Sequence, residues 1–413
     1  MKRMFYLNAL CFMLGCWQAE AQIYDTNNDT VQTFAGSGFT GYLDGQGTQT
    51  MWSAPSSIVA DSSGNLFVWD SGNHRVRKIT PAGAVSTFVG GGPSALQGYG
   101  TNVWFSYQLV SPMVMDHSNG VWMVGYNSGN YFLLKIGSDS YVSVENVNLP
   151  GLSFNNAPCV DSANNLYYTD STHVYRYFPT NGTYEIFVGS GNGGLVDGNG
   201  IFSSFSSAGA LTADAADNLY VNDSGLIRRV SQNRDVVTIA GGGSGDGVGR
   251  SAGIGSLSAI CMDQSGNIIF AGSTANGTSI RKMTATTNVI TLAGSFSQYG
   301  YTNGPGYLAR FFQAYGVCVS QGAIFVTDSG NQRIRNITFN PVPQPVSGGS
   351  LSLSTYAGLK LTGVIGRSYQ IQSSTNMTNW QDETTIFLTA SPYLWIDQNG
   401  LGKKKFYRAF LLP

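Results

Sequence analysis

The sequence predicts an all-β fold, and two features of its composition and one repeated pattern support this. Only 11% of the 413 residues are charged, compared with roughly 25% in typical soluble domains. The chain also holds 53 glycines, 22 tyrosines and 22 phenylalanines, which is typical of short strands joined by tight turns. The formal net charge of -1 provides no dense basic face, so we expect no nucleic-acid partner.

The repeated pattern is a plan shared by six segments: an apolar run ending in Asp, a turn, a second apolar run, another turn, and an Arg-rich strand. In the first copy these runs are SIVAD (57–61), LFVWD (66–70) and HRVRKI (74–79). The Asp that ends the first run recurs in five copies, and Ser320 takes its place in the last. A unit of several short strands repeated in this way predicts a propeller blade.

A fourth, Gly-rich strand of each unit shows how the ends of the chain meet. Typical copies are VSTFVGGG (85–92) and VVTIAGGG (236–243). One copy, VQTFAGSG (31–38), precedes the first unit, whereas a Pro-rich stretch follows the last. This offset predicts that the N-terminal strand completes the last blade and covers its open edge. The sequence therefore predicts a closed six-bladed β-propeller.

The repeats also resemble a known family. The segments DSSGNLFVWDSGNHRVRKIT (61–80) and TDSGNQRIRNIT (327–338) are similar to NHL repeats, as are the connections GYLDGQG (41–47), GLVDGNG (194–200) and GSGDGVG (244–250). The resemblance covers residues 31–339 and implies a six-bladed propeller of the TolB-like/NHL type, usually an interaction or recognition scaffold. It also implies that the first run lies innermost, at the central channel, and the Gly-rich strand outermost.

The N-terminus carries an export signal rather than a fold element. Lys2 and Arg3 precede an apolar stretch that ends in the small-x-small pattern Ala19-Glu20-Ala21. An alternative interpretation is a lipoprotein site with Cys16 lipidated. We therefore expect a secreted or cell-surface protein organised as a signal peptide (1–21), a monomeric propeller (22–339), a Pro/Gly-rich linker (340–349) and a C-terminal module (350–413).

The C-terminal module departs from the blade pattern. Five short apolar segments predict a small all-β sandwich, immunoglobulin-like or fibronectin-like. YQIQSSTNMTNW (369–380) and KFYRAFLLP (405–413) are similar to a tail found on many secreted bacterial proteins. That resemblance implies an accessory role, such as surface attachment or export.

Aligning the repeats within the chain predicts a structural ion pair. An Arg in the third strand recurs with an Asp at the end of the second strand in four blades, which predicts a charge-assisted contact that holds each hairpin. The alternative is an anion-binding ring of arginines. The four predicted pairs are Asp70–Arg77, Asp170–Arg176, Asp223–Arg228 and Asp328–Arg335.

The Asp that ends each first run allows two interpretations. Carboxylates at equivalent ends of channel-lining strands could bind Ca²⁺ or another divalent cation, which prefers oxygen ligands. Alternatively, each Asp caps the turn that follows it. We favour the turn cap and expect no cofactor, because six blades surround a channel too wide for all of these residues to reach one ion. The residues are Asp61, Asp116, Asp161, Asp214 and Asp263.

Three cysteines share one repeat position, two residues before this Asp or its Ser substitute: Cys159, Cys261 and Cys318. Equivalent points on different blades should lie beyond the ~7 Å Cα separation that a disulfide allows. We expect buried free thiols that pack as small apolar residues.

The second blade differs from the others. It lacks the Arg–Asp pair and is rich in aromatic residues, which could stack on sugars or anchor a protein partner. The plainer alternative is that these aromatics pack between blades. The candidate ligand-binding residues are Tyr99, Trp104, Tyr107, Trp122, Tyr126 and Tyr131.

Catalysis finds little support in the sequence. Gluconolactonase-like propellers place a metal-binding Glu early on an inner strand, but the glutamates after the leader are Glu145, Glu185 and Glu383. Only three histidines are present, and their spacing matches no common metal motif. We therefore expect a non-catalytic scaffold that recognises a protein or glycan. The alternative is a metal-dependent hydrolase or lyase with its site at the channel mouth.

Overall fold

The computed structural model describes residues 29–93, 96–105, 112–127, 130–145, 149–151, 157–339, 357–361, 364–376, 378–389, 393–397 and 406–412. The chain divides into two compact units, residues 1–342 and 343–413. The predicted signal peptide (1–21), with Cys16, and the predicted linker (340–349) lie outside the described residues. Within those residues, no helix is long and apolar enough to cross a membrane.

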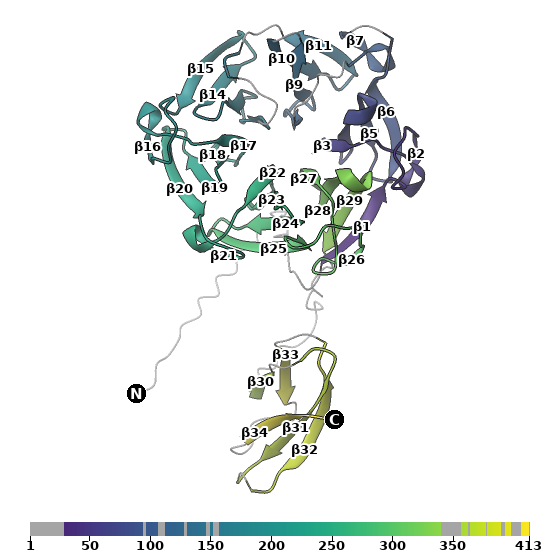
Figure 1. Cartoon of the computed structure of the whole chain (residues 1–413), viewed down its shortest axis with the longest axis vertical. Helices are drawn as coiled ribbons and strands as arrows, with labels where there is room; N and C mark the ends of the chain where they lie inside the picture. Colours follow the sequence, from purple (N-terminus) through teal and green to yellow (C-terminus); the bar gives the residue numbers. More distant parts are fainter. Residues whose placement is uncertain are drawn as a thin grey trace, which may run out of the picture. The chain divides into compact units, whose positions relative to one another are not determined.

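The described part of the first unit holds six antiparallel sheets that surround a central channel (Figure 1). We number these blades in chain order. From the outer edge inward, blade 1 consists of β2 (Gly45–Gln46), β6 (Ala84–Gly90), β5 (Arg75–Ile79), β4 (Leu66–Asp70) and β3 (Pro55–Ala60). Blade 2 consists of β7 (Gly98–Tyr99), β11 (Tyr141–Glu145), β10 (Asn130–Ile136), β9 (Val121–Asn127) and β8 (Val114–Met115). Blade 3 consists of β15 (Thr183–Val188), β14 (Val174–Phe178), β13 (Leu166–Thr169) and β12 (Cys159–Val160).

The remaining three blades follow the same plan. Blade 4 consists of β16 (Gly198–Asn199), β20 (Asp235–Gly241), β19 (Leu226–Val230), β18 (Leu219–Asp223) and β17 (Ala208–Ala213). Blade 5 consists of β21 (Gly247–Val248), β25 (Asn288–Ser295), β24 (Thr278–Met283), β23 (Ile268–Ser273) and β22 (Ser256–Met262). Blade 6 consists of β26 (Gly304–Pro305), β1 (Asp29–Ala35), β29 (Arg333–Phe339), β28 (Ala323–Asp328) and β27 (Ala314–Ser320).

The predicted ring closure is confirmed. Strand β1, from the start of the described chain, pairs antiparallel with β29, and Val31 lies opposite Ile337. Both side chains are buried in the core between blades 5 and 6. The two ends of the ring are therefore joined by a continuous ladder of backbone hydrogen bonds.

The outer edge differs from the plan implied by the family resemblance. In five blades a two-residue strand pairs outside the Gly-rich strand. It comes from the connection between blades, and in blades 1, 2, 4 and 5 a 3₁₀ turn follows: η1 (Gly47–Gln49), η3 (Gly100–Asn102), η4 (Gly200–Phe202) and η5 (Gly249–Ser251). The first residue of each turn has a φ near +55°, at 50° for Gly47 and 57° for Gly200, which explains why glycine recurs there. Two further 3₁₀ turns, η2 (Ser71–Asn73) and η6 (Ser329–Asn331), follow β4 and β28.

The hydrophobic core is divided among the contacts between blades. Each pair of neighbouring blades encloses one cluster of buried apolar residues. For example, Trp69 of blade 1 packs edge-on against Phe105, which lies between β7 and β8 of blade 2, with 5.6 Å between ring centroids. Because each sheet is buried on both faces, its strands read as apolar runs with few charges.

The second unit is a small all-β unit of two sheets. Strands β30 (Ala357–Leu361) and β33 (Tyr393–Asp397) form one pair. Strands β32 (Gln381–Phe387), β31 (Ser368–Ser374) and β34 (Phe406–Leu411) form the other sheet, with β31 at its centre. Each of these strands overlaps one of the five segments expected from the sequence.

Closure of the ring makes a testable prediction for Val31. Val31→Ala removes two buried methyl groups from the closing strand, so we expect the free energy of unfolding to fall by roughly 1–3 kcal/mol. Urea unfolding measures this. Gln32→Ala, at the exposed neighbouring position, is the matched control and should change stability by less than about 0.5 kcal/mol. Equal effects of the two substitutions would show that β1 does not carry the closure.

Candidate functional site

The Asp residues at one end of the channel cap turns. Asp61 Oδ1 accepts the backbone N–H groups of Ser63 (2.9 Å) and Asn65 (2.8 Å), and Oδ2 accepts from Asn65 Nδ2 (2.7 Å). Asp161, Asp214 and Asp263 make the same contacts with an Asn four residues later. Within the described residues, no group of three or more His, Cys, Asp and Glu is arranged to hold a metal ion. The carboxylates are directed at their own turns and not at one another.

Asp116 is a variant of this cap. Its Oδ1 accepts the Gly120 N–H (2.7 Å), and its Oδ2 accepts from Trp122 Nε1 (3.0 Å) and pairs with Lys135 Nζ (3.1 Å). Burial alone raises the pKa of Asp116, but the hydrogen bonds and the nearby ammonium group outweigh it and lower that pKa overall. The side chain is therefore a carboxylate that is fully used by the scaffold.

These turns also link neighbouring blades. The N–H of Ser62 donates to Asn119 Oδ1 of the next blade (3.1 Å), and His117 N–H donates in the same way to Asn164 Oδ1 (2.9 Å). Asn119 and Asn164 have φ values of 60° and 63°, a left-handed conformation that asparagine tolerates. At this end of the channel, the polar groups of the turns therefore bind one another and hold neighbouring blades together.

A buried arginine organises each regular blade. In blade 4, Arg228 is fully buried and donates to Asp223 Oδ2 (2.8 Å), Asp197 Oδ1 (3.0 Å), the Ser204 carbonyl (3.1 Å) and the Val196 carbonyl (2.9 Å). Asp223 ends the second strand, as the predicted pair requires. The other three acceptors lie in the connection from the preceding blade. The arginine therefore fastens that connection to the blade as well as holding the hairpin.

The same arrangement recurs in blades 1 and 6. Arg77 pairs with Asp70 (3.1 Å) and Arg335 with Asp328 (2.7 Å), and both guanidinium groups also bind their blade's connection. Burial raises the pKa of Asp70 to about 6, against the lowering effects of Asn73, Ser53 and Arg77. In blade 5, Arg281 has no such Asp and relies on Asp246 and two carbonyls.

The predicted pair in blade 3 is wrong. Asp170 accepts instead from His173 Nδ1 and Tyr175 OH, both at 2.9 Å, and from the turn backbone. Arg176 binds Glu185 on the fourth strand and Tyr167. Groups of the local turn bind the Asp170 carboxylate, so it is not available to Arg176. Arg176 pairs instead with the Glu185 carboxylate on the neighbouring strand.

The connection carboxylates were missed by the sequence prediction. Asp44, Asp197 and Asp246 each bind the buried arginine and also accept from the N–H and hydroxyl of a Thr on the fourth strand. The signal was present, because these are the Asp residues of the repeated DG connections.

The blade 2 aromatics do not form one surface among the described residues. The Tyr99 ring packs at a tilt against Tyr141 at the outer edge (4.7 Å between centroids), whereas Trp104 lies beside His74 of blade 1 (6.2 Å). Trp122 is buried, and Tyr131 packs against its cluster between blades 2 and 3. Tyr107 and the side chain of Tyr126 lie outside the described residues.

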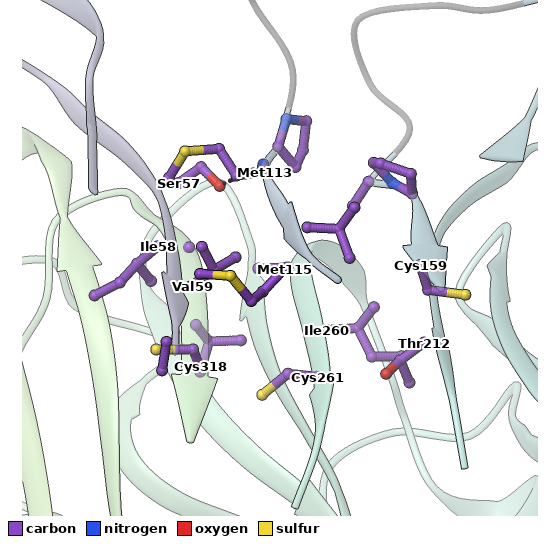
Figure 2. A pocket seen from close by; sticks show the side chains of 18 of the residues that line it. Ser57, Ile58, Val59, Met113, Met115, Cys159, Thr212, Ile260, Cys261 and Cys318 are labelled. Carbon is purple, nitrogen blue, oxygen red and sulfur yellow. Dashed lines mark hydrogen bonds between the residues drawn. The ribbon is translucent and has the colours of Figure 1, made fainter. Parts of the chain in front are cut away.

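The central part of the channel is a narrow throat of about 280 Å³. Side chains from the innermost strands of all six blades, or from the residues just before them, line it, including Val59, Met115, Thr212 and Cys261 (Figure 2). The three cysteines are free thiols, with Cys159 and Cys318 buried, as predicted. Burial raises the pKa of all three thiols, so they remain neutral and unreactive.

The opposite end of the channel from the Asp turns opens into a larger mouth of about 600 Å³. This volume is in the range of small-molecule sites, roughly 300–1,000 Å³. Small or neutral polar residues dominate its wall, with the aromatic rings of Trp69 and Tyr315. No Asp, Glu, Lys, Arg or His is among the described residues that form it. The remaining residues are Ser56, Ser57, Ser71, Pro112, Ser207, Gly209, Ala210, Asn222, Ser256, Leu257 and Ser258.

The mouth contains polar groups with no partner among the described residues. Trp69 Nε1 and Asn222 Oδ1 are buried and unpaired. Most buried polar atoms in proteins are hydrogen-bonded, so such groups call for a ligand or ordered water. Tyr315 is 43% exposed and offers a free aromatic face.

A repeat position that carries no chemical signature by itself forms this mouth. Counting back five residues from the turn Asp or its Ser substitute gives Ser56, Gly209, Ser258 and Tyr315, all of which line the mouth. Three of the four are small, which leaves room for a ligand at the channel axis. Aligning the starts of the inner runs groups these four positions, but serine and glycine there do not by themselves indicate a site.

With this geometry, the fold is that of a β-propeller with a polar pocket at one end of its channel. Residues 53–79 match the NHL repeat model, so this part of blade 1 is an NHL repeat within the propeller fold. No curated protein matches its sequence.

Solved structures share the fold. A structural genomics protein of Bacteroides thetaiotaomicron is 16% identical, with a TM-score of 0.60 over 76% of each chain. An auxiliary nutrient binding protein of Bacteroides ovatus is 15% identical, with a TM-score of 0.56 over 76% of this chain and 77% of its own. A protein of the same description from Bacteroides thetaiotaomicron is 17% identical, with a TM-score of 0.52 over 75% and 76%.

The buried arginine makes a prediction about stability. Arg228→Lys keeps the charge but cannot reach all four acceptors, which leaves buried carboxylate and carbonyl groups unpaired. We expect the free energy of unfolding to fall by about 3 kcal/mol. Arg229→Lys, at the exposed neighbouring position, is the control for a generic effect. A loss below about 1 kcal/mol in Arg228→Lys would contradict the role assigned to the Arg228 guanidinium group.

The capped carboxylate of Asp116 makes a prediction about pH. A folded-state pKa below the unfolded value of about 4 stabilises the protein above that pH, and the contribution is lost as the pH falls. Asp116→Asn should therefore destabilise the protein at pH 7, and its difference from wild type should shrink as the pH falls below about 4. Thermal unfolding between pH 7 and 3 measures this. Asp139→Asn, on an exposed turn of the same blade, is the control, and a difference independent of pH would refute the cap.

Proposed function

We propose that the protein is a non-catalytic recognition scaffold that acts outside the cell and binds a small ligand at the wide mouth of the propeller channel. The observation that carries this proposal is the mouth itself, where an indole N–H and an amide oxygen are buried without partners beside a cavity of about 600 Å³. Leaving such groups unpaired costs roughly 1–3 kcal/mol each, a cost that a bound ligand offsets.

Three further observations support binding in preference to catalysis. The mouth wall has no carboxylate, imidazole or ammonium group among its described residues, so acid–base chemistry has no obvious agent there. The carboxylates at the other end of the channel are occupied by their turns. Two relatives of the same fold are described as auxiliary nutrient binding proteins, and a binding role for this chain agrees with that description.

Filling the mouth provides the test. Gly209 lines the mouth with a β carbon position 3.6 Å from Asn222 Nδ2, so Gly209→Leu places a side chain beside that amide. We expect wild-type protein to bind compounds from a panel of neutral and charged sugars, amino acids and nucleosides, and Gly209→Leu to weaken that binding at least about tenfold. Calorimetric titration measures the change.

Gly193→Leu is the matched control, because Gly193 lies on a connection between blades with no atom within 4 Å of its β carbon position. Undiminished binding by Gly209→Leu would refute the mouth as the site. Metal analysis tests the alternative of a metal-dependent hydrolase or lyase. We expect no stoichiometric divalent ion, and one that disappears in Asp161→Asn or Asp214→Asn would favour the enzyme.

A further inference from the structure

We infer that the ligand of the mouth is a neutral saccharide, which stacks on Tyr315 and is held by hydrogen bonds from Asn222 and the surrounding serines. This inference rests on the proposed function and specifies the chemical class of its ligand. The charge, the polar groups and the aromatic surface of the mouth each contribute a separate argument.

The first argument is charge. A site for a carboxylate, phosphate or ammonium group needs an opposite charge or an oriented cluster of donors to replace water. The described wall of the mouth contains neither an acidic nor a basic residue. The arginines nearest in the repeat, such as Arg228, are fully buried and their charges are committed to the scaffold. A charged ligand would therefore lose hydration without compensation.

The second argument is the set of free polar groups. Asn222 Oδ1 is buried with no partner among the described residues, and Ser56, Ser207 and Ser256 line the mouth. A serine hydroxyl both donates and accepts, and an amide offers two donors and one acceptor. A saccharide presents hydroxyls that also donate and accept, so its chemistry complements these groups.

The third argument is the aromatic surface. Tyr315 lies in β27 of blade 6, five residues before the position of the turn Asp, where the other blades that line the mouth have Ser or Gly. A large exposed ring at a position that otherwise stays small departs from the repeat, and such departures are expected at functional sites. The C–H face of a sugar ring packs on an aromatic face, while its hydroxyls reach the polar wall.

The throat below the mouth limits how the ligand enters. Ser57, Pro112 and Tyr315 line both cavities, so the mouth leads directly into the throat. The throat holds about 280 Å³ and is lined by apolar and sulfur-containing side chains such as Val59 and Met115. A hydroxyl-rich ligand is therefore expected to remain in the mouth, where its partners are, and not to pass into the channel.

Calorimetric titration with defined sugars tests the inference. The probes are glucose, galactose, mannose, xylose, maltose and cellobiose, with glucuronate and glucosamine as charged counterparts. We expect at least one neutral sugar to bind, with the charged counterparts weaker. Tyr315→Ala should weaken that binding at least about tenfold, whereas Tyr315→Phe, which keeps the ring, should stay within about threefold of wild type.

Asn222→Leu provides a second variant and should also weaken binding at least about tenfold. Tyr307→Ala, at another exposed tyrosine of the same blade region, is the matched control and should have no effect. Because Tyr315 is exposed, its substitution leaves the fold intact even if Asn222→Leu lowers stability. Thermal unfolding of each variant checks this.

The outcomes separate this inference from the proposed function. If no panel compound binds, or if Gly209→Leu binds as wild type does, the mouth is not the site and both fail. If a charged sugar, an amino acid or a nucleoside binds and Gly209→Leu abolishes it while neutral sugars do not bind, the mouth is the site but the saccharide assignment is wrong. A neutral sugar whose affinity is unchanged in Tyr315→Ala and Asn222→Leu would also overturn the inference.

Discussion

The antiparallel pairing of β1 with β29 is the constraint on which the rest of the propeller depends. A blade is an antiparallel sheet buried on both faces, so each blade needs a neighbour on either side, and a row of blades leaves two open faces and an unpaired edge. Pairing Val31 with Ile337 removes both liabilities at once. It also fixes the ring circumference, and therefore the width of the channel and the spacing of the residues at its mouth.

Within that ring, the buried arginines hold the parts that backbone pairing cannot reach. A connection between blades such as residues 41–53 has only short strand pairing of its own, and Arg77 binds it through two carbonyls and Asp44. Burying a guanidinium group is costly unless nearly all its donors are paired. Arg77 meets that condition with five hydrogen bonds and a contact of 4.0 Å with the Trp52 ring. The arrangement therefore specifies one path for the connection more than it adds net stability.

The sequence was sufficient to predict the ring closure and three of the ion pairs, because the residues that form them repeat. The early copy of the Gly-rich strand at 31–38 predicted the closure, and the recurring Arg and Asp predicted the ion pairs of blades 1, 4 and 6. Blade 3 shows the limit of this reasoning, because His173 and Tyr175 compete for Asp170 while Glu185 satisfies Arg176. A repeated residue indicates its position in the sheet. Its hydrogen-bond partner depends on neighbouring side chains that vary from one repeat to the next.

The mouth could not be predicted from the sequence, for a related reason. Its wall consists of small residues, and serine or glycine at the start of a strand has many structural explanations. Only the ring brings Ser56, Gly209, Ser258 and Tyr315 from four blades to one opening.

The two ends of the channel differ in whether the protein itself satisfies their polar groups. At the turn end, each carboxylate accepts several hydrogen bonds and neighbouring turns bind one another. Its polar groups are satisfied by the protein itself, and a ligand would have to displace these bonds. At the mouth, the indole N–H of Trp69 and the amide oxygen of Asn222 are buried and unpaired within the described structure. Unpaired polar groups in a confined space lower the stability of the empty protein and raise the free energy gained when a complementary molecule binds. The turn end is therefore satisfied by the scaffold, whereas the mouth keeps polar groups that the proposed ligand would pair.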